Sequence, residues 1–141
     1  MNALVAKYIE HNHYGKHLGM TFKIIQAGEV HYELTIRTEH LATPNAAHGG
    51  LLASLVDAAL GVAGLSAVCE ENKVVSTVEY KMNFMSPALL HDKLLAKARV
   101  IQRGKRILII NCDVICTNRE NKLIATALGT FNAYDAAKAG Y

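Results

Sequence analysis

One apolar segment in the middle of the chain constrains the fold more than any other feature. It runs from Gly49 to Cys69 and carries a single charge, Asp57, near its centre. Its length approaches the roughly 20 residues that span a bilayer, but a charge at the bilayer centre costs about 2.5–3.5 kcal/mol or more. No Trp or Tyr belt flanks it. We therefore interpret the segment as a helix buried within its own protein, with a membrane span as the minor alternative.

Alternation of apolar and polar residues predicts β-strands on both sides of this helix. In residues 30–38, for example, Val30, Tyr32 and Leu34 face one side while His31 and Glu33 face the other. Short turns between successive strands favour antiparallel pairing. The predicted fold class is α+β: one domain, residues 1–141, in which a curved antiparallel sheet of five to six strands wraps around the long helix. Strands are expected at residues 20–26, 30–38, 75–85, 93–102, 106–117 and 122–134, after a short helix over residues 2–12.

Composition narrows the class of protein. A chain of 141 residues fits a single domain, and 51% hydrophobic against 19% charged residues excludes disorder. The net charge is only +3, without the dense basic face of a nucleic-acid binder. We expect neither a nucleic acid nor a membrane as partner, whereas a small anionic ligand fits this charge.

Cysteine usage indicates a reducing compartment. Cys69, Cys112 and Cys116 form an odd set with no Cys-x-x-Cys pair. On one strand, Cys112 and Cys116 would lie about 13 Å apart, beyond the roughly 7 Å Cα separation that a disulfide allows. Residues 1–16 also lack the apolar run of a signal peptide. We expect buried free thiols and a cytoplasmic protein.

Common metal and cofactor motifs are absent. The sequence has no dinucleotide fingerprint, phosphate loop, His-Glu-x-x-His or Gly-x-Ser-x-Gly. His11, His13 and His17 cluster near the N-terminus, but no cysteine or carboxylate cluster accompanies them. We expect His31 and His40 at the surface. The sequence therefore predicts no metal and no cofactor.

The segment Asn45-Ala46-Ala47-His48-Gly49-Gly50 leads directly into the apolar helix. The first N–H groups of a helix lack intrahelical acceptors and carry the positive end of the helix dipole. Because glycine has no side chain, a substrate carbonyl could approach Gly49 and Gly50 closely, as in an oxyanion hole. The alternative is that His48 simply caps the helix and the glycines permit tight packing.

Asp57 is the second candidate for chemistry. An ionised carboxylate in an apolar helix is costly unless it is paired, hydrogen-bonded or facing a cleft. A hydrogen-bonded structural aspartate is one interpretation. The functional interpretation is a general base or a nucleophile that acts on an electrophilic carbon.

These residues together resemble a known family. His48-Gly49-Gly50, Asp57 nine residues after the histidine, and the downstream Asn83-Phe84-Met85-Ser86-Pro87-Ala88 are similar to the hotdog-fold acyl-CoA thioesterases, of the phenylacetic acid degradation and 4-hydroxybenzoyl-CoA types. The resemblance covers residues 18–133 and implies the hotdog fold. It implies that Asp57 activates water or attacks the thioester, while the Gly49 N–H polarises the carbonyl and His48 orients it.

Other positions match this family less directly. Thr77 aligns with a Ser or Thr that positions the water in some members, although it could be an ordinary strand threonine. Ala42 stands where many members have Asn or Gln, and Asn45 where they usually have Gly. Asn45 is a candidate to supply the missing carboxamide.

The resemblance also implies coenzyme A as part of the substrate, so cations are needed for its phosphates. Arg103 and Arg106, in a hairpin that also carries Arg99 and Lys105, are candidates. A solvated charged turn is the alternative for each. The remaining candidate substrate-binding residues are Asn45, Gly50, Ser86 and Pro87.

Three functions are compatible with these observations. The first is hydrolysis of an acyl-CoA thioester to the free acid and CoA. The second is a hotdog hydratase or dehydratase, although those pair a catalytic His with a helical Glu or Asp and generally lack the Gly-Gly start. The third is a non-catalytic acyl-CoA-binding protein. The presence of Ala42, where many family members have Asn or Gln, favours this third function. The sequence does not distinguish aryl from alkyl acyl groups.

Helix geometry predicts a homodimer. Eight residues separate Gly49 from Asp57, about 12 Å along the axis at 1.5 Å per residue. The reacting carbon must lie roughly 3 Å from the attacking atom, which one straight helix does not allow. Two antiparallel helices would bring Asp57 of one chain beside Gly49 of the other. The family resemblance implies the same shared site, within a dimer of dimers.

Overall fold

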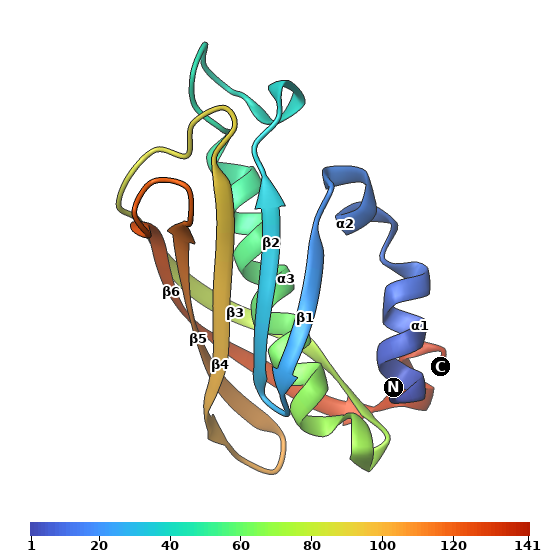
Figure 1. The fold of residues 1–141 in the computed structure, drawn as a ribbon. Helices are drawn as coiled ribbons and strands as arrows, with labels where there is room; N and C mark the ends of the chain where they lie inside the picture. The colour runs from blue at the N-terminus through green and yellow to red at the C-terminus, as the bar shows by residue number, and fades with distance from the viewer.

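The computed structural model describes all 141 residues and has one antiparallel sheet curved around a central helix (Figure 1). The sheet has six strands in the order β1-β2-β4-β5-β6-β3. The α+β architecture expected from the sequence is confirmed. The helices are α1 (Ala3–His11), α2 (His13–Leu18) and α3 (Gly49–Val68), and the short 3-10 helices are η1 (Thr38–His40), η2 (Cys69–Glu71) and η3 (Ala136–Ala139). The strands are β1 (Thr21–Gln26), β2 (Glu29–Thr35), β3 (Lys73–Phe84), β4 (Lys93–Arg103), β5 (Ile107–Cys116) and β6 (Lys122–Asp135).

The apolar segment is the central helix α3, as predicted. It is long and apolar enough to cross a membrane, but 67% of its most apolar stretch is buried within the protein. Leu55, Val56 and Leu60 are fully buried. The helix packs against all six strands, which explains why apolar residues occur on almost every side of it.

Strand β3 does not pair with its sequence neighbour β4. It pairs with β6 instead, in a register that runs from Lys73 opposite Asp135 to Phe84 opposite Ala125. The connection over residues 85–92 is therefore a crossover and not a hairpin. As a result, β3 lies at the edge of the sheet with one side of its backbone unpaired, and its residues 76–79 are exposed.

The N-terminal segment holds one predicted and one unpredicted helix. Helix α1 confirms the amphipathic pattern, and its Leu4 and Val5 pack in a small cluster with Leu65 and Val74. Helix α2 was not predicted, because six residues are too few for a periodic signal. Two local features define it: the Asn12 side chain accepts a hydrogen bond from the Gly15 N–H, and Gly19 ends the helix with φ 82°.

The prediction that His40 lies at the surface is wrong. His40 is the last residue of η1, and its ring is buried next to the end of α2. Nδ1 accepts the N–H of Arg37 at 2.9 Å, and Nε2 lies 3.0 Å from the Leu18 carbonyl oxygen. These two hydrogen bonds satisfy the polar atoms of the ring and make burial possible. The His40 carbonyl also accepts the N–H of His48, so the buried histidine holds the chain in place just before α3.

The cysteines are free and buried, as expected. Burial raises the pKa of the Cys112 thiol to about 12. This group therefore stays protonated and acts as a small apolar side chain in the core.

Gly129 of β6 packs tightly against the central helix and against β3. A Cβ atom there would lie 3.0 Å from Leu60 Cδ1 and 3.1 Å from Tyr80 Cβ. Overpacking of this kind costs about 1–3 kcal/mol. We predict that Gly129→Ala lowers the free energy of unfolding by this amount in urea denaturation. Leu128→Ala, at the neighbouring and half-exposed position, is the control and should change it by about 0.5 kcal/mol or less. Equal effects of the two substitutions would contradict the close contact.

Candidate active site

The start of α3 presents one free backbone donor. His48 is the N-cap, and its Nδ1 accepts the N–H of Gly50 at 2.7 Å. The Gly49 N–H makes no hydrogen bond within the chain. Of the two glycine N–H groups expected to point outward, only that of Gly49 is thus available to a substrate oxygen. The capping role of His48 and the donor role predicted for Gly49 are compatible in this geometry.

A side chain at Gly49 and a side chain at Gly50 would meet different neighbours. A Cβ at Gly50 would lie 2.9 Å from His48 Nδ1, so a larger residue would displace the capping ring. A Cβ at Gly49 would lie at an ordinary 3.6 Å from the ring of Phe84, an exposed residue of β3. The space beside the free Gly49 N–H is therefore bordered by an aromatic ring.

Two loops meet at the start of α3. The Ala47 N–H donates to the Ala88 carbonyl at 2.8 Å, and the Leu90 N–H donates to the Asn45 carbonyl at 3.1 Å. These bonds bring the predicted residues Ser86 and Pro87 to the same end of the molecule as His48 and Gly49. The Asn45 side chain is exposed and makes no hydrogen bond within the chain.

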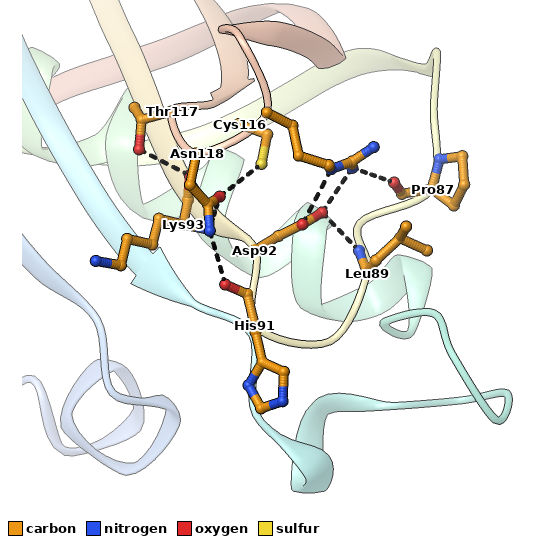
Figure 2. A network of polar contacts seen from close by, with 9 residues as sticks. Pro87, Leu89, His91, Asp92, Lys93, Cys116, Thr117 and Asn118 are labelled. Carbon is orange, nitrogen blue, oxygen red and sulfur yellow. Dashed lines mark hydrogen bonds and ion pairs between the residues drawn. The ribbon is translucent and has the colours of Figure 1, made fainter.

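An ion pair between buried Asp92 and half-buried Arg119 fixes this crossover loop (Figure 2). Asp92 is 4% exposed and receives two hydrogen bonds from Arg119, at 3.0 and 2.6 Å. The same carboxylate accepts the Leu89 N–H at 2.7 Å, and Arg119 also donates to the Pro87 carbonyl at 3.0 Å. The pair therefore holds residues 87–89 from both sides, and through the bond to Ala47 it supports the start of α3. Sequence reasoning missed it, because neither residue belongs to a motif.

Asp57 and Thr77 form the second cluster. The Thr77 hydroxyl, on the edge strand β3, donates to Asp57 Oδ1 at 2.7 Å. Asp57 is half-buried, and its Oδ2 accepts no hydrogen bond within the chain. The structure therefore brings these two predicted residues together and orients the carboxylate.

The two clusters are separate within one chain. Gly49 and Asp57 lie on the same continuous helix, about 12 Å apart along its axis. The structure thus brings His48, Gly49, Ser86 and Pro87 together, and Asp57 with Thr77, but it does not bring one group to the other.

A pocket of about 360 Å³ opens beside Asp57 and Thr77. Its walls come from α1, α3, β3, β6 and the C-terminal residues, with nine hydrophobic residues among the thirteen that line it. Tyr8 of α1 is one of them. Burial, the hydrogen bond to Tyr32 and the nearby charges raise the pKa of Tyr8, so its phenol stays neutral. Burial and the Asp57 charge also raise the pKa of Tyr80, which lies on β3 three residues after Thr77.

The predicted phosphate-binding hairpin lies at the other end of α3. Arg103 forms an ion pair with Glu71, which directly follows that helix. Gly49 begins the helix, so one chain does not bring Arg103 or the hairpin residue Arg106 to the free Gly49 N–H. No group of three or more His, Cys, Asp or Glu side chains is placed to hold a metal ion.

Comparisons with known proteins identify the family of this chain. The family model described as "Thioesterase superfamily" matches residues 45–122, which include the start of α3, Asp57 and Thr77. The chain is 32% identical to human acyl-coenzyme A thioesterase 13 over 100 residues, 70% of this chain and 68% of that protein. It is also 32% identical to a protein of Archaeoglobus fulgidus over 106 residues, 75% of this chain and 65% of that one. By sequence, the chain thus spans about two thirds of the length of these relatives.

Solved structures match nearly the whole fold. The E. coli PaaI protein from the phenylacetic acid degradation operon has a TM-score of 0.84 at 22% identity, covering 92% of this chain and 90% of its own. A mutant of the PaaI protein of Thermus thermophilus has a TM-score of 0.75 at 24% identity, covering 84% of this chain and 96% of its own. The fold is the hotdog fold. The chain belongs to the thioesterase superfamily, a class of thioester hydrolases, and its fold is of the PaaI type.

The ion pair of Asp92 and Arg119 gives a prediction for stability. Arg119→Ala leaves a buried carboxylate without its charged partner, so it should lower the free energy of unfolding by about 1–3 kcal/mol in urea denaturation. Arg119→Lys keeps the charge but loses the two-pronged geometry and should lower it by less. Lys122→Ala, at an exposed lysine nearby, is the control and should have little effect. Equal stability of Arg119→Ala and wild type would show that the pair does not fix the loop.

Proposed function

We propose that this protein hydrolyses an acyl-CoA thioester to the free acid and CoA. The observation that carries the proposal is the Asp57 carboxylate, oriented by Thr77 at 2.7 Å and facing a mostly apolar pocket. Its position in the segment matched by the thioesterase model, and the similarity to human acyl-coenzyme A thioesterase 13, support the same reaction.

In the proposed reaction, Asp57 accepts a proton from a water molecule while the water oxygen bonds to the thioester carbon. The carbonyl oxygen becomes negatively charged and is stabilised by the Gly49 N–H and the positive end of the α3 dipole. His48 helps to orient this carbonyl. The tetrahedral intermediate then collapses: the carbon–sulfur bond breaks, and the CoA thiolate takes up the proton that Asp57 had accepted. In the alternative route Asp57 attacks the carbon itself, the carbon–sulfur bond breaks with release of the CoA thiolate, and water hydrolyses the resulting anhydride to the free acid and the Asp57 carboxylate.

The proposal requires two chains, because Gly49 and Asp57 lie about 12 Å apart along one helix. The open edge of β3 supports a dimer. It has 12 residues, and an unpaired edge of this length is a template for pairing with another strand. Val78, Phe84 and Met85 are more than half exposed there, an unfavourable arrangement for a monomer. Pairing of two β3 strands would place Asp57 near Gly49 of the partner subunit. A dimer of such dimers is part of the same proposal.

The remaining proposals concern the residues that bind the substrate, the need for a cofactor and the location in the cell. Asn45, Ser86 and Pro87 surround the start of α3, and we propose that they line the approach of the substrate. For Arg103 and Arg106 to bind CoA phosphates, a hairpin of another protomer must reach that approach. We propose that the reaction needs no metal or cofactor and takes place in the cytoplasm, for which the three free cysteines speak.

Hydrolysis of a panel of acyl-CoAs, followed by release of the free thiol, tests this function. We predict that Asp57→Asn lowers kcat by about 10²- to 10⁴-fold, because asparagine keeps the shape but accepts no proton. Thr77→Val, which removes the hydroxyl that orients the carboxylate, should lower kcat by a smaller factor.

The control is Asp113→Asn, on the exposed side of β5, whose carboxylate likewise accepts a threonine hydroxyl, that of Thr126. Its activity should equal that of wild type. A folded Asp57→Asn protein with wild-type kcat would refute the proposed mechanism.

A further inference from the structure

The pocket beside Asp57 is elongated along the central helix. Asp57, Gly61 and Leu65 all line it and lie one helical turn apart on the same face of α3. The distance from Asp57 to Leu65 is about 12 Å along the axis. On the opposite wall, the lining residues of β3 run from Thr77 to Val74, a similar length. An acyl group with its carbonyl at Asp57 would therefore extend past Gly61 toward Leu65.

Gly61 stands at the middle of this path, and packing does not require a glycine there. A Cβ on Gly61 would have Phe131 as its nearest neighbour at 3.7 Å, an ordinary contact. By contrast, a Cβ on Gly64 would lie 3.1 Å from Ile110 Cδ1 and 3.3 Å from Val75 Cγ2. Gly64 therefore allows the helix to pack closely on the sheet, whereas Gly61 faces the open space of the pocket.

Glycine within a helix lowers stability relative to alanine. Gly61 is half-buried and lies in the fourth turn of a 20-residue helix, where neither a cap nor a positive φ calls for glycine. Gly61 therefore disfavours the helix and is not needed for packing. We infer that the pocket requires open space at this position.

Part of the pocket wall comes from outside the segment matched by the family model. That segment covers residues 45–122, whereas Tyr8, Phe131, Tyr134 and Tyr141 also line the pocket. Helix α1 and the C-terminal residues lie side by side at this end of the molecule (Figure 1), and Lys7 Nζ lies 5.7 Å from the centre of the Tyr141 ring. The matched segment thus contains Asp57 but only part of the pocket wall.

We propose that Gly61 determines the size of the acyl group, by leaving open the passage between Asp57 and the apolar end of the pocket at Leu65 and Val74. This inference rests on the proposed function. Its substrates are acyl-CoAs whose acyl group extends at least to the middle of the pocket. The CoA part remains outside, because 360 Å³ is at the low end for a drug-sized ligand.

The test compares acetyl-, hexanoyl- and decanoyl-CoA as substrates. Side chains on a helix lean toward its N-terminus, so the leucine introduced by Gly61→Leu would lean toward Asp57 and block the passage. We expect this variant to lower the ratio of kcat/KM for decanoyl- over acetyl-CoA by about 10- to 200-fold. Gly61→Ala should lower the ratio less and raise Tm, since alanine fits and favours the helix.

Ala67→Leu is the matched control, because Ala67 lies on the same helix, is half-buried and does not line this pocket. Its substrate ratio should equal that of wild type. A wild-type ratio in both Gly61 variants would overturn the proposal.

A binding measurement separates this inference from the proposed hydrolysis. Titration calorimetry with decanoate, a carboxylic acid, requires no turnover. Wild type and Ala67→Leu should bind it, and Gly61→Leu should bind it at least about tenfold more weakly. This result would support the role of Gly61 even if no acyl-CoA were hydrolysed. Equal binding by wild type and Gly61→Leu, or no binding by wild type, would overturn it.

Discussion

The structure depends on the burial of one apolar helix by a curved sheet. Helix α3 contacts every strand, and its burial removes most of its apolar surface from water. Because β3 is the edge strand, the side of α3 that carries Asp57 lies next to an unpaired sheet edge. The only charge of the helix is thereby satisfied by Thr77 and remains accessible. The arrangement that stabilises the fold also places the Asp57 carboxylate beside a pocket.

The two parts of the proposed active site are held in place by different interactions. At the start of α3, the His48 cap takes the Gly50 N–H and leaves that of Gly49 free. The surrounding loops are fixed by His40 on one side and by the pair of Asp92 and Arg119 on the other. Asp57 instead depends on β3. A rigid helix keeps these groups apart in one chain, and this separation makes a second chain necessary in the proposed mechanism.

Much of the fold followed from local patterns in the sequence. Alternation located the six strands, and uniform apolarity located α3, because both reflect which faces of an element are buried. The pairing of β3 with β6 did not follow, since strand order depends on contacts between distant residues. The burial of His40 depends on a hydrogen bond from Arg37 and a contact with Leu18, which no local pattern encodes.

For the site, the family resemblance identified Asp57 and Thr77 as candidates, but it did not predict the hydrogen bond between them. Two further contacts were seen only in the three-dimensional structure. One is the hydrogen bond from the Gly50 N–H to His48, and the other is the ion pair of Glu71 with Arg103.

The shared site is the central claim, and purified mixed dimers test it most directly. Gly49→Pro removes the oxyanion donor while proline is tolerated at the first helical position, and Asp57→Asn removes the carboxylate. Each substitution alone should give an inactive protein. A heterodimer isolated with two different affinity tags would contain one site with both groups intact, and we predict that it recovers up to half of the wild-type thiol release. Verified heterodimers without activity would contradict a site built from Asp57 of one chain and Gly49 of the partner subunit.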